Sequence, residues 1–178
     1  MGLGRFGKCF EHTIHMNKDI YHFQSIEDSS LYTFTSEGIH GKIHKVVLMS
    51  PLIDELNAHF DPLFNLAFGD IVRLKDSWVL DDSIRTGNGD MPKVIATVAA
   101  IAIAFLEKHP HSTLSFQGYM DPKSAFLGKN QRNILYQRGI NSNWEELSAK
   151  LRFWGVKAGK FESYTRGSTY DRILANRK

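Results

Sequence analysis

The sequence predicts an α+β fold in which a mostly antiparallel sheet holds a buried central helix, with further helices on one face. Three observations indicate this class. Residues 31–49 alternate apolar and polar side chains, residues 91–108 repeat apolar side chains at helical spacing, and residues 151–177 hold strand-like runs between glycines. Strands at both ends of a chain with a buried helix between them favour one helix-on-sheet domain.

The first strands form a β-hairpin. We predict strands at Leu31–Ser36 and Ile39–Met49, because both runs are rich in β-branched and aromatic residues. Glu37-Gly38 forms the turn, since glycine readily adopts a positive φ. Side chains two apart share a face of a strand. The second strand therefore has a core face with Ile39, Ile43 and Val47 and a solvent face with His40, Lys42 and His44.

The hairpin is followed by less regular sequence. Pro51 ends the second strand, and Pro51–Phe60 can hold a short helix. A third strand is predicted at Asn65–Leu74, with Gly69-Asp70 as a bulge or bend. Asp81–Asp90 is dense in turn-forming residues and is predicted to be a loop.

The central helix has clear ends. Asp90 supplies an N-cap oxygen, Pro92 fits the first turn, and Pro110 stops the helix, so it covers residues 91–108. Apolar side chains surround it almost completely, which predicts that four of them are nearly fully buried: Val94, Val98, Ile101 and Phe105. A strand at Ser112–Gly118 follows, with Leu114 and Phe116 facing inward.

Two shorter helices and the last strands complete the chain. Asn130–Arg138 is predicted to be helical, with Gly139 ending the helix in the left-handed conformation. Asn143, with Glu146 three residues later, predicts a capping box for a second helix. The remaining residues form two or three strands broken at Gly155, Gly159 and Gly167.

The composition favours a single globular domain. The 178 residues are 42% hydrophobic and 23% charged, which excludes a disordered or fibrous chain. We expect residues 1–15 to be a loose extension and residues 16–178 to be one α+β domain. Cys9 is the single cysteine, and the longest apolar run, residues 94–106, is shorter than the ~20 residues that cross a bilayer. These features predict a cytoplasmic protein with no membrane partner.

Several motifs resemble a small uncharacterised family of Bacteroidota proteins. They are Asn88-Gly89-Asp90, Lys93-Val94 and Ala96-Thr97-Val98-Ala99 around the start of the central helix, Phe116-Gln117-Gly118 after it, and then Arg132, Leu135-Tyr136 and Arg138-Gly139-Ile140. The resemblance covers residues 20–178 discontinuously, and residues 120–127 (MDPKSAFL) depart from the family pattern as an insertion. It implies this order of elements and an intracellular location, and it supplies no activity.

Charge is distributed unevenly along the chain. Residues 129–178 hold eleven Lys and Arg against four Asp and Glu, whereas residues 1–128 hold eleven against fifteen. A basic segment of this kind is typical of proteins that bind nucleic acid, although chance clustering gives the same count. The candidate nucleic-acid-binding residues are Lys129, Arg132, Tyr136, Arg138, Lys150, Arg152, Lys157 and Lys160.

Arg132 and Tyr136 have two interpretations. They lie four residues apart and therefore on one face of a helix. Arg pairs with phosphate and Tyr stacks on an unpaired base, which suits RNA or single-stranded DNA. The same spacing also fits a Tyr136 that packs in the core, beside cations that merely solvate the helix. The sequence leaves both open.

A small toxin-like nuclease is the enzymatic alternative. His109 and His111 are suited to general acid and base cleavage of RNA, and Arg132 to a phosphate contact. A histidine at a helix end also serves as a cap. Asp81, Asp82 and Asp90 are the carboxylates that a magnesium-dependent nuclease would use, although Asp in a loop more often forms turns.

No metal site or cofactor is expected. His40 and His44 share a strand face, but Lys42 stands between them and would repel a cation. Gly128-Lys129-Asn130 resembles part of a phosphate loop, but the first glycine and the magnesium-binding hydroxyl of that loop are missing.

These observations favour a non-catalytic binding protein whose basic C-terminal third engages RNA, single-stranded DNA or a nucleoprotein. An accessory or inhibitor protein carried by a mobile element or phage, acting for example on a host ribonucleoprotein, belongs to this class. The alternatives are the nuclease above and a protein–protein interaction module without nucleic acid.

Overall fold

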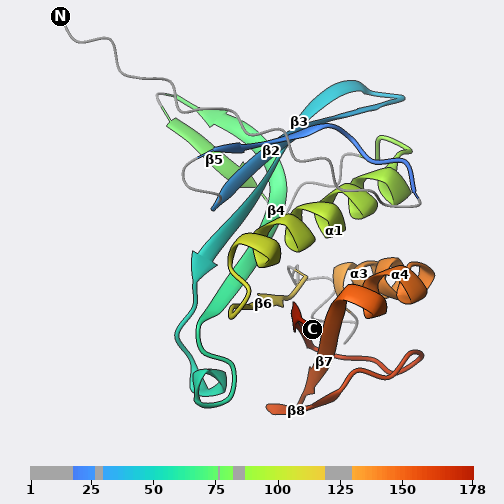
Figure 1. Ribbon diagram of the computed structural model, residues 1–178. Coiled ribbons are helices and arrows are strands. Elements are labelled where there is room, and N and C mark those ends of the chain that lie inside the picture. The colour runs from blue at the N-terminus through green and yellow to red at the C-terminus, as the bar shows by residue number, and fades with distance from the viewer. Residues whose placement is uncertain (1–17, 27–29, 76, 82–86, 119–129) are drawn as a thin grey trace, which may run out of the picture.

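The computed structural model describes residues 18–26, 30–75, 77–81, 87–118 and 130–178. Within them it confirms the α+β class: a mostly antiparallel sheet is covered on one face by helices (Figure 1). The expected loose extension, residues 1–15, lies outside the described residues. No helix in the described ranges has the length and apolarity that a membrane span needs.

The nine strands in this part of the chain form one sheet in the order β1-β2-β3-β4-β6-β9-β7-β8, with β5 also paired to β4. Two of them, β1 and β5, were not predicted from the sequence. The strands are β1 (Phe23–Ile26), β2 (Leu31–Gly38), β3 (Gly41–Pro51), β4 (Leu63–Leu74), β5 (Ser77–Asp81), β6 (Thr113–Phe116), β7 (Leu151–Lys157), β8 (Lys160–Ser163) and β9 (Arg172–Arg177).

The helices lie between the strands in sequence. Figure 1 shows α1 running across the sheet, with α3 and α4 together beside β7. The short helix expected within Pro51–Phe60 is present as one 3-10 turn. The helices are η1 (Glu55–Ala58), α1 (Met91–Lys108), α3 (Gln131–Ser142) and α4 (Trp144–Lys150).

Strand β4 joins the two halves of the sheet. Its residues 63–65 pair in parallel with residues 113–115 of β6, whereas the other described strand pairs are antiparallel. A parallel pair needs a long crossover connection. Here that connection includes β5 and α1, so the central helix is placed over the seam between the halves.

The hairpin turn differs from the sequence prediction. Gly38 pairs with Gly41, so the turn is formed by Ile39 and His40 and not by Glu37-Gly38. Ile39, predicted to lie in the core, is 78% exposed. The cause is distant in sequence. The Asn88 carbonyl accepts from the Ile39 N–H at 3.1 Å and its side-chain oxygen accepts from the His40 N–H at 2.8 Å, which fixes the turn two residues later than expected.

The core face of β3 carries an unexpected charge. Lys45 follows Ile43 on that face and is only 5% exposed, as is Asp70 on the neighbouring strand β4. The two form an ion pair in register with each other. The register of β3 with β4 is unbroken through Gly69 and Asp70, so the predicted bulge is absent there. A buried charge of this kind depends on its partner.

Helix α1 has the predicted limits but a different cap. Asp90 occupies the N-cap position and makes no side-chain cap hydrogen bond. Its carboxylate instead accepts from the hydroxyls of Ser36 at 2.6 Å and Tyr21 at 2.7 Å. Asp90 therefore ties the start of α1 to β2 and to the segment before β1. Pro92 in the first turn has no N–H that needs a cap, so the Asp90 carboxylate can bond Ser36 and Tyr21 instead of the helix backbone.

Helices α3 and α4 also depart from the predicted boundaries. Gly139 does not end α3, which continues to Ser142. The glycine instead allows α3 to pack closely on α1, because a Cβ at this position would collide with Ile95. The capping box predicted from Asn143 and Glu146 is not formed, since the Asn143 amide donates to the Gly139 carbonyl at 2.7 Å. Asn130 does cap α3, by accepting from the Asn133 N–H at 3.1 Å.

The C-terminal strands are not broken at every predicted glycine. Gly155 lies inside β7, where a Cβ would collide with the ring of Tyr170. Gly159 forms the β7–β8 turn with a positive φ, and Gly167 lies in the loop before β9. Close packing and backbone conformation are two separate reasons for glycine, and the sequence pattern does not distinguish them.

The main core lies between the helices and the sheet. Val94, Ile101 and Phe105 of α1 are buried in it as predicted. Val98 is only partly buried, because it lines a cavity between α1 and the sheet. A second, smaller cluster covers the opposite face of the sheet and contains Leu56, Phe60, Leu63, Val156 and Leu174.

Candidate nucleic-acid interface

The structure places most of the predicted cations on exposed surfaces. Arg138 is exposed on α3, Lys150 at the end of α4, Arg152 and Lys157 on β7, and Lys160 on β8. Lys129 lies outside the described residues, and of Arg132 only the backbone, in the first turn of α3, is described.

These cations do not form one continuous patch. Arg152 and Lys157 are five residues apart on one strand, so their side chains point to opposite faces of the sheet. Lys157 pairs with Lys160 across the β7–β8 turn, which brings those two together. Arg138 and Lys150 lie on the helical side. The basic residues are thus divided between the hairpin tip, the outer sheet face and the helices.

Tyr136 occupies the packing position that the sequence left open. Its ring contacts Phe116 at a centroid distance of 6.5 Å in an edge-to-face arrangement. The side chain is half-buried and lines the cavity beneath α1. Tyr136 therefore points toward the core side of α3.

The polar side of α3 is also occupied. Asn133 is buried, accepts from the Gly118 N–H at 2.6 Å and donates to the Tyr170 carbonyl at 3.1 Å. Gln137 is buried and donates to the Ser168 carbonyl at 2.8 Å. These bonds attach the loop before β9 to the helix, and between Asn133 and Ile140, where the side chains are described, Arg138 alone is exposed.

A cluster of aromatic rings stands out on the outer face of the C-terminal strands, the face that carries the smaller apolar cluster. It comprises His59, Phe60, Trp154 and Phe161, and we call it the ring cluster. Phe60 contacts both Trp154 and Phe161 at centroid distances of 5.0 Å, and His59 contacts Phe161 at 5.0 Å. Phe161 is 37% exposed and His59 is also exposed, whereas Phe60 is buried beneath them.

Strand pairing explains how these rings meet. Phe161 of β8 lies opposite Val156 of β7, on the same face as Trp154 two residues earlier. Arg152, two residues before Trp154, projects from this face as well. The ring cluster is therefore continuous with one of the predicted cations.

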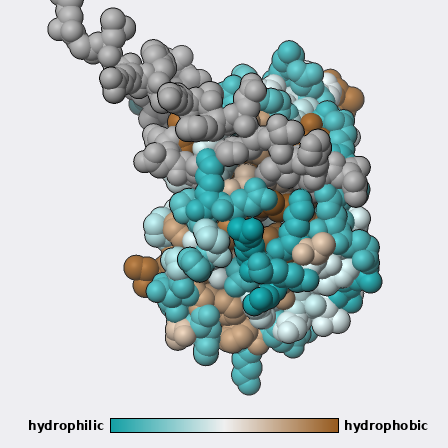
Figure 2. Space-filling view, in the orientation of Figure 1, coloured by the Kyte–Doolittle hydropathy of each residue, from teal (hydrophilic) through white to brown (hydrophobic). Residues whose placement is uncertain are grey.

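The segment before β4 supplies the other two rings. Asp54 caps η1 by accepting from the Leu56 N–H at 2.9 Å and pairs with Arg172 of β9 at 2.7 Å. Leu56 and Phe60 then pack into the smaller cluster. These contacts attach the segment to the outer face and leave His59 at the surface beside Phe161. Figure 2 shows hydrophobic atoms at the lower left of the molecule, near the segment that joins β3 to η1, beside a largely hydrophilic surface.

Three carboxylates near the C-terminal strands have partners. Asp54 is paired with Arg172, and Glu162 accepts from the Tyr170 hydroxyl at 3.0 Å. Asp171 accepts from the Ala158 N–H at 3.0 Å. By contrast, Arg152, Lys157 and Lys160 make no ion pair within the described part of the chain. The cations on β7 and β8 are therefore available to an anionic partner.

The residues of the enzymatic alternative are not brought together. His109 and His111 lie just before β6, and the His109 ring packs on Phe105 at a centroid distance of 4.5 Å. Arg132 lies at the other end of β6, because the neighbouring Asn133 accepts a hydrogen bond from the N–H of Gly118, which follows that strand. At about 3.3 Å per residue, β6 and its flanking residues separate the two histidines from Arg132 by roughly 20 Å.

A metal centre is not supported either. No group of three or more His, Cys, Asp and Glu with a geometry that could hold a metal ion occurs in the described ranges. Asp81 lies opposite Asp70 in the sheet, Asp90 is bonded to Ser36 and Tyr21, and Asp82 lies outside the described residues.

Sequence reasoning missed the ring cluster. His59 and Phe60 precede Phe161 by about a hundred residues, so no local pattern links them. One sequence signal pointed to it: side chains alternate between the two faces of the predicted strand around Trp154, and this strand lies in the basic third of the chain.

Comparison with known proteins identifies the family. A model for a family of unknown function, DUF6934, matches residues 17–178. The chain belongs to the DUF6934 family. The match includes every described element and confirms the resemblance to an uncharacterised family. No curated protein and no solved structure matches this DUF6934 chain.

Proposed function

We propose that this protein is a non-catalytic binding protein whose basic C-terminal third engages single-stranded nucleic acid, either RNA or DNA, free or within a nucleoprotein. The observation that carries the proposal is the position of the exposed rings of Phe161 and His59 on the sheet face from which Arg152 of β7 also projects. Rings that stack on bases and cations that contact phosphates are the two components of such sites.

The arrangement favours unpaired bases over duplex. Bases inside a duplex present their edges, whereas splayed bases present faces that stack on aromatic side chains. Phe161 and His59 lie on an open sheet face, and Arg152 projects from the same face near Trp154. A single-stranded nucleic acid that follows β7 on this face would meet the rings first and Arg152 next. Lys157 and Lys160 project from the other face at the hairpin tip, so they would contact its backbone where it passes around the sheet edge formed by β8.

The wider setting belongs to the same proposal. A cytoplasmic location, an origin in Bacteroidota and a role as a mobile-element or phage-borne accessory or inhibitor, for example of a host ribonucleoprotein, are consistent with it. A protein partner without nucleic acid is the outcome expected if the rings and cations bind no oligonucleotide.

The test is fluorescence anisotropy with labelled oligo-U RNA, oligo-dT and a duplex of matched length at low salt. We expect both single strands to bind more tightly than the duplex. Phe161→Ala should weaken binding about 5- to 150-fold, the equivalent of the ~1–3 kcal/mol that one stacked base contributes. Val79→Ala, which truncates an exposed apolar residue on β5, is the matched control and should leave affinity unchanged. Absence of binding to all three, or equal affinities of Phe161→Ala and wild type, would overturn the proposal.

A further inference from the structure

Strand β8 forms one edge of the sheet. Among the strands that the structure describes, its one neighbour in the strand order is β7. All four of its residues, Lys160–Ser163, are exposed. Figure 1 shows β8 at the lower end of the molecule, beyond β7 and away from α1. An open edge of this kind presents backbone N–H and C=O groups that can pair with another strand.

The hydrogen bonds of β7 show which β8 residue faces the open edge. In an antiparallel pair, opposed residues alternate between those that exchange backbone hydrogen bonds and those that do not. The Val156 carbonyl accepts from the Asp171 N–H at 2.8 Å, on the β9 side of β7. Val156 lies opposite Phe161, so this pair exchanges no backbone bonds. The N–H and C=O groups of Phe161 therefore point away from β7, toward the open edge.

The side chains of β8 complement a second copy of the same strand. Lys160 and Glu162 project from one face, and Phe161 projects from the other, the face of the ring cluster. When two copies of β8 pair antiparallel about Phe161, each Lys160 lies opposite Glu162 of the second copy. The two Phe161 side chains then lie together on the other face. Opposite charges and aromatic pairs both stabilise directly opposed strand positions.

Charge also disfavours the neighbouring registers. A pairing centred on Lys160 would place the two lysines opposite each other, and a pairing centred on Glu162 would do the same with two carboxylates. Like charges that are directly opposed destabilise a strand pair. The alternation of charge along β8 therefore favours the register centred on Phe161.

The cations at the β7–β8 turn support the same pairing. Lys157 and Lys160 lie directly opposite each other, and neither makes an ion pair within the described ranges. Glu162 of the second copy would lie beside Lys160 and offset this repulsion. The carboxylate of Glu162 is held on the required face, because one of its oxygens accepts from the Tyr170 hydroxyl at 3.0 Å. Its other oxygen can accept from a lysine.

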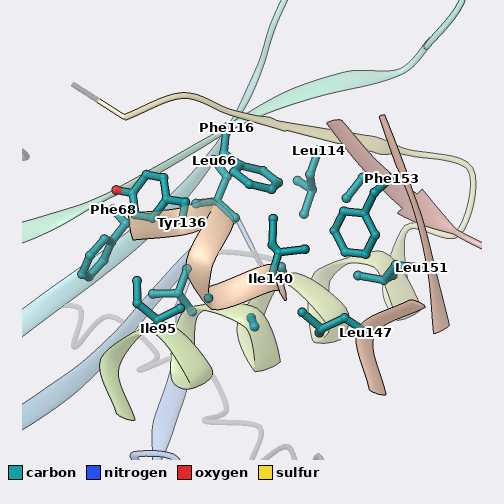
Figure 3. Close-up of a pocket in the computed structure, with 15 residues that line it drawn as sticks. Leu66, Phe68, Ile95, Leu114, Phe116, Tyr136, Ile140, Leu147, Leu151 and Phe153 are labelled. Atoms are coloured by element: carbon teal, nitrogen blue, oxygen red, sulfur yellow. The ribbon is translucent and has the colours of Figure 1, made fainter. Parts of the chain in front are cut away.

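We propose that two copies of this chain associate through β8, in antiparallel register about Phe161, so that the sheet continues from one copy into the other. The two-fold axis is perpendicular to the sheet, which places both ring clusters on the same face. The apolar cavity between α1 and the sheet, shown with Ile95, Tyr136 and Phe153 in Figure 3, lies on the opposite face and stays within each copy.

This association does not rest on the proposed function. A nucleic acid that passes around the β8 edge and a second copy of the chain would compete for that edge. Self-association is therefore measured on the protein alone, and its presence or absence leaves the oligonucleotide titration to be judged separately.

The experiment is analytical ultracentrifugation of the full-length protein over a range of concentrations. We expect a reversible monomer–dimer equilibrium, because a short strand pair gives a small interface. Lys160→Glu should weaken the dimer about ten-fold, since two opposite-charge pairs become like-charge pairs. Lys178→Glu, which makes the same charge change at an exposed position outside β8, is the matched control and should dimerise as wild type does.

A mixture of two variants tests the register. Glu162→Lys should also weaken self-association, but an equimolar mixture of Glu162→Lys and Lys160→Glu should form a dimer, because each lysine again faces a carboxylate. Circular dichroism checks that both variants fold, since Glu162→Lys loses the bond to Tyr170. A mixture that associates no more tightly than either variant alone would overturn the proposed register.

Amide hydrogen exchange of the wild type locates the interface without any substitution. The Phe161 amide faces the open edge and should gain protection as the protein concentration rises, whereas the Glu162 amide faces β7 and should change little. A wild type that stays monomeric at its highest soluble concentration, a dimer that Lys160→Glu leaves unchanged, or Phe161 protection that is independent of concentration would each overturn the proposal.

Discussion

Gly139 of α3 lies directly against the side chain of Ile95 in α1, where the two helices are in contact. A methyl group at position 139 would overlap the Ile95 side chain, so the distance between the helices depends on this glycine. Both residues also line the apolar cavity between the helices and the sheet. It therefore determines both the packing of the core and the shape of the space beneath α1.

Gly139→Ala should destabilise the protein by about 1–3 kcal/mol, the usual cost of forcing extra atoms into a packed core. Helix propensity acts in the opposite direction, because alanine favours a helix interior by about 1 kcal/mol over glycine. Urea unfolding measures the balance. Ser142→Ala, at an exposed position of the same helix, is the control and should change stability little. A Gly139→Ala protein more stable than wild type would show that the helices do not approach as closely as described.

Val98→Asp should reduce stability by about 2–5 kcal/mol, because it places a carboxylate against an apolar lining that offers no cation. Val98→Thr, which has nearly the same shape, separates the effect of charge from that of lost packing. Thermal melting of the three proteins at neutral pH gives the comparison. A Val98→Asp protein that melts within a degree or two of wild type would contradict the position of α1 over the sheet.

The pKa of the Asp90 carboxyl is lowered in the folded protein. Burial acts to raise this pKa, but hydrogen bonds from Ser36 and Tyr21, together with the charge of Lys45, outweigh burial. A carboxyl with a lower pKa in the native state stabilises it above the unfolded value of about 3.9, and this contribution is lost as pH falls through the folded pKa.

Asp90→Asn should therefore lower stability at pH 7 and have a smaller effect near pH 3. The measurement is the urea midpoint of wild type and variant at both pH values. Ser36→Ala removes one of the hydrogen bonds that lower the pKa and should shift the acid transition of the otherwise unchanged protein to higher pH. An equal loss of stability for Asp90→Asn at pH 7 and pH 3 would show that the charge of the Asp90 carboxylate does not stabilise the folded protein.

Binding to single-stranded nucleic acid should weaken steeply with salt, because each neutralised phosphate releases counterions. Lys157→Ala with Lys160→Ala should reduce the log–log salt slope by about 0.7 per lost phosphate contact. Lys129→Ala with Arg132→Ala tests in the same way whether the start of α3 belongs to the interface. Both pairs should weaken all sequences alike, since phosphate contacts do not read bases. A slope unchanged by either pair would place the nucleic acid elsewhere.

The limits of the central helix were predicted closely because their determinants are local: Pro92, Pro110 and an apolar pattern without a polar face. The hairpin turn was displaced because Asn88, about fifty residues away, bonds the backbone of Ile39 and His40. Gly139 was predicted to end a helix because a glycine that permits close packing and one that permits a positive φ look the same in sequence. Contacts between distant segments account for each of these differences.

The candidate site was likewise predicted only in part. Composition alone identified the exposed cations of β7 and β8 as candidates, since charged residues in a basic segment are seldom buried. The rings on the same face as Arg152 were not predicted, because His59 and Phe161 are about a hundred residues apart and meet only in the folded sheet. Strand alternation would have separated Arg152 from Lys157 once β7 was known, but the faces of β7 were not assigned in advance.

Among the described strand pairs, only β4 and β6 are parallel. This parallel pair has a consequence for the order of folding. Strands β1 to β5 pair each with the next along the chain, so this half is a meander whose contacts close short loops and can form early. The seam joins residues 63–65 to residues 113–115 and needs α1 in place before it closes. We expect the meander to gain protection from amide exchange first, and the C-terminal strands to gain it only when the seam has formed.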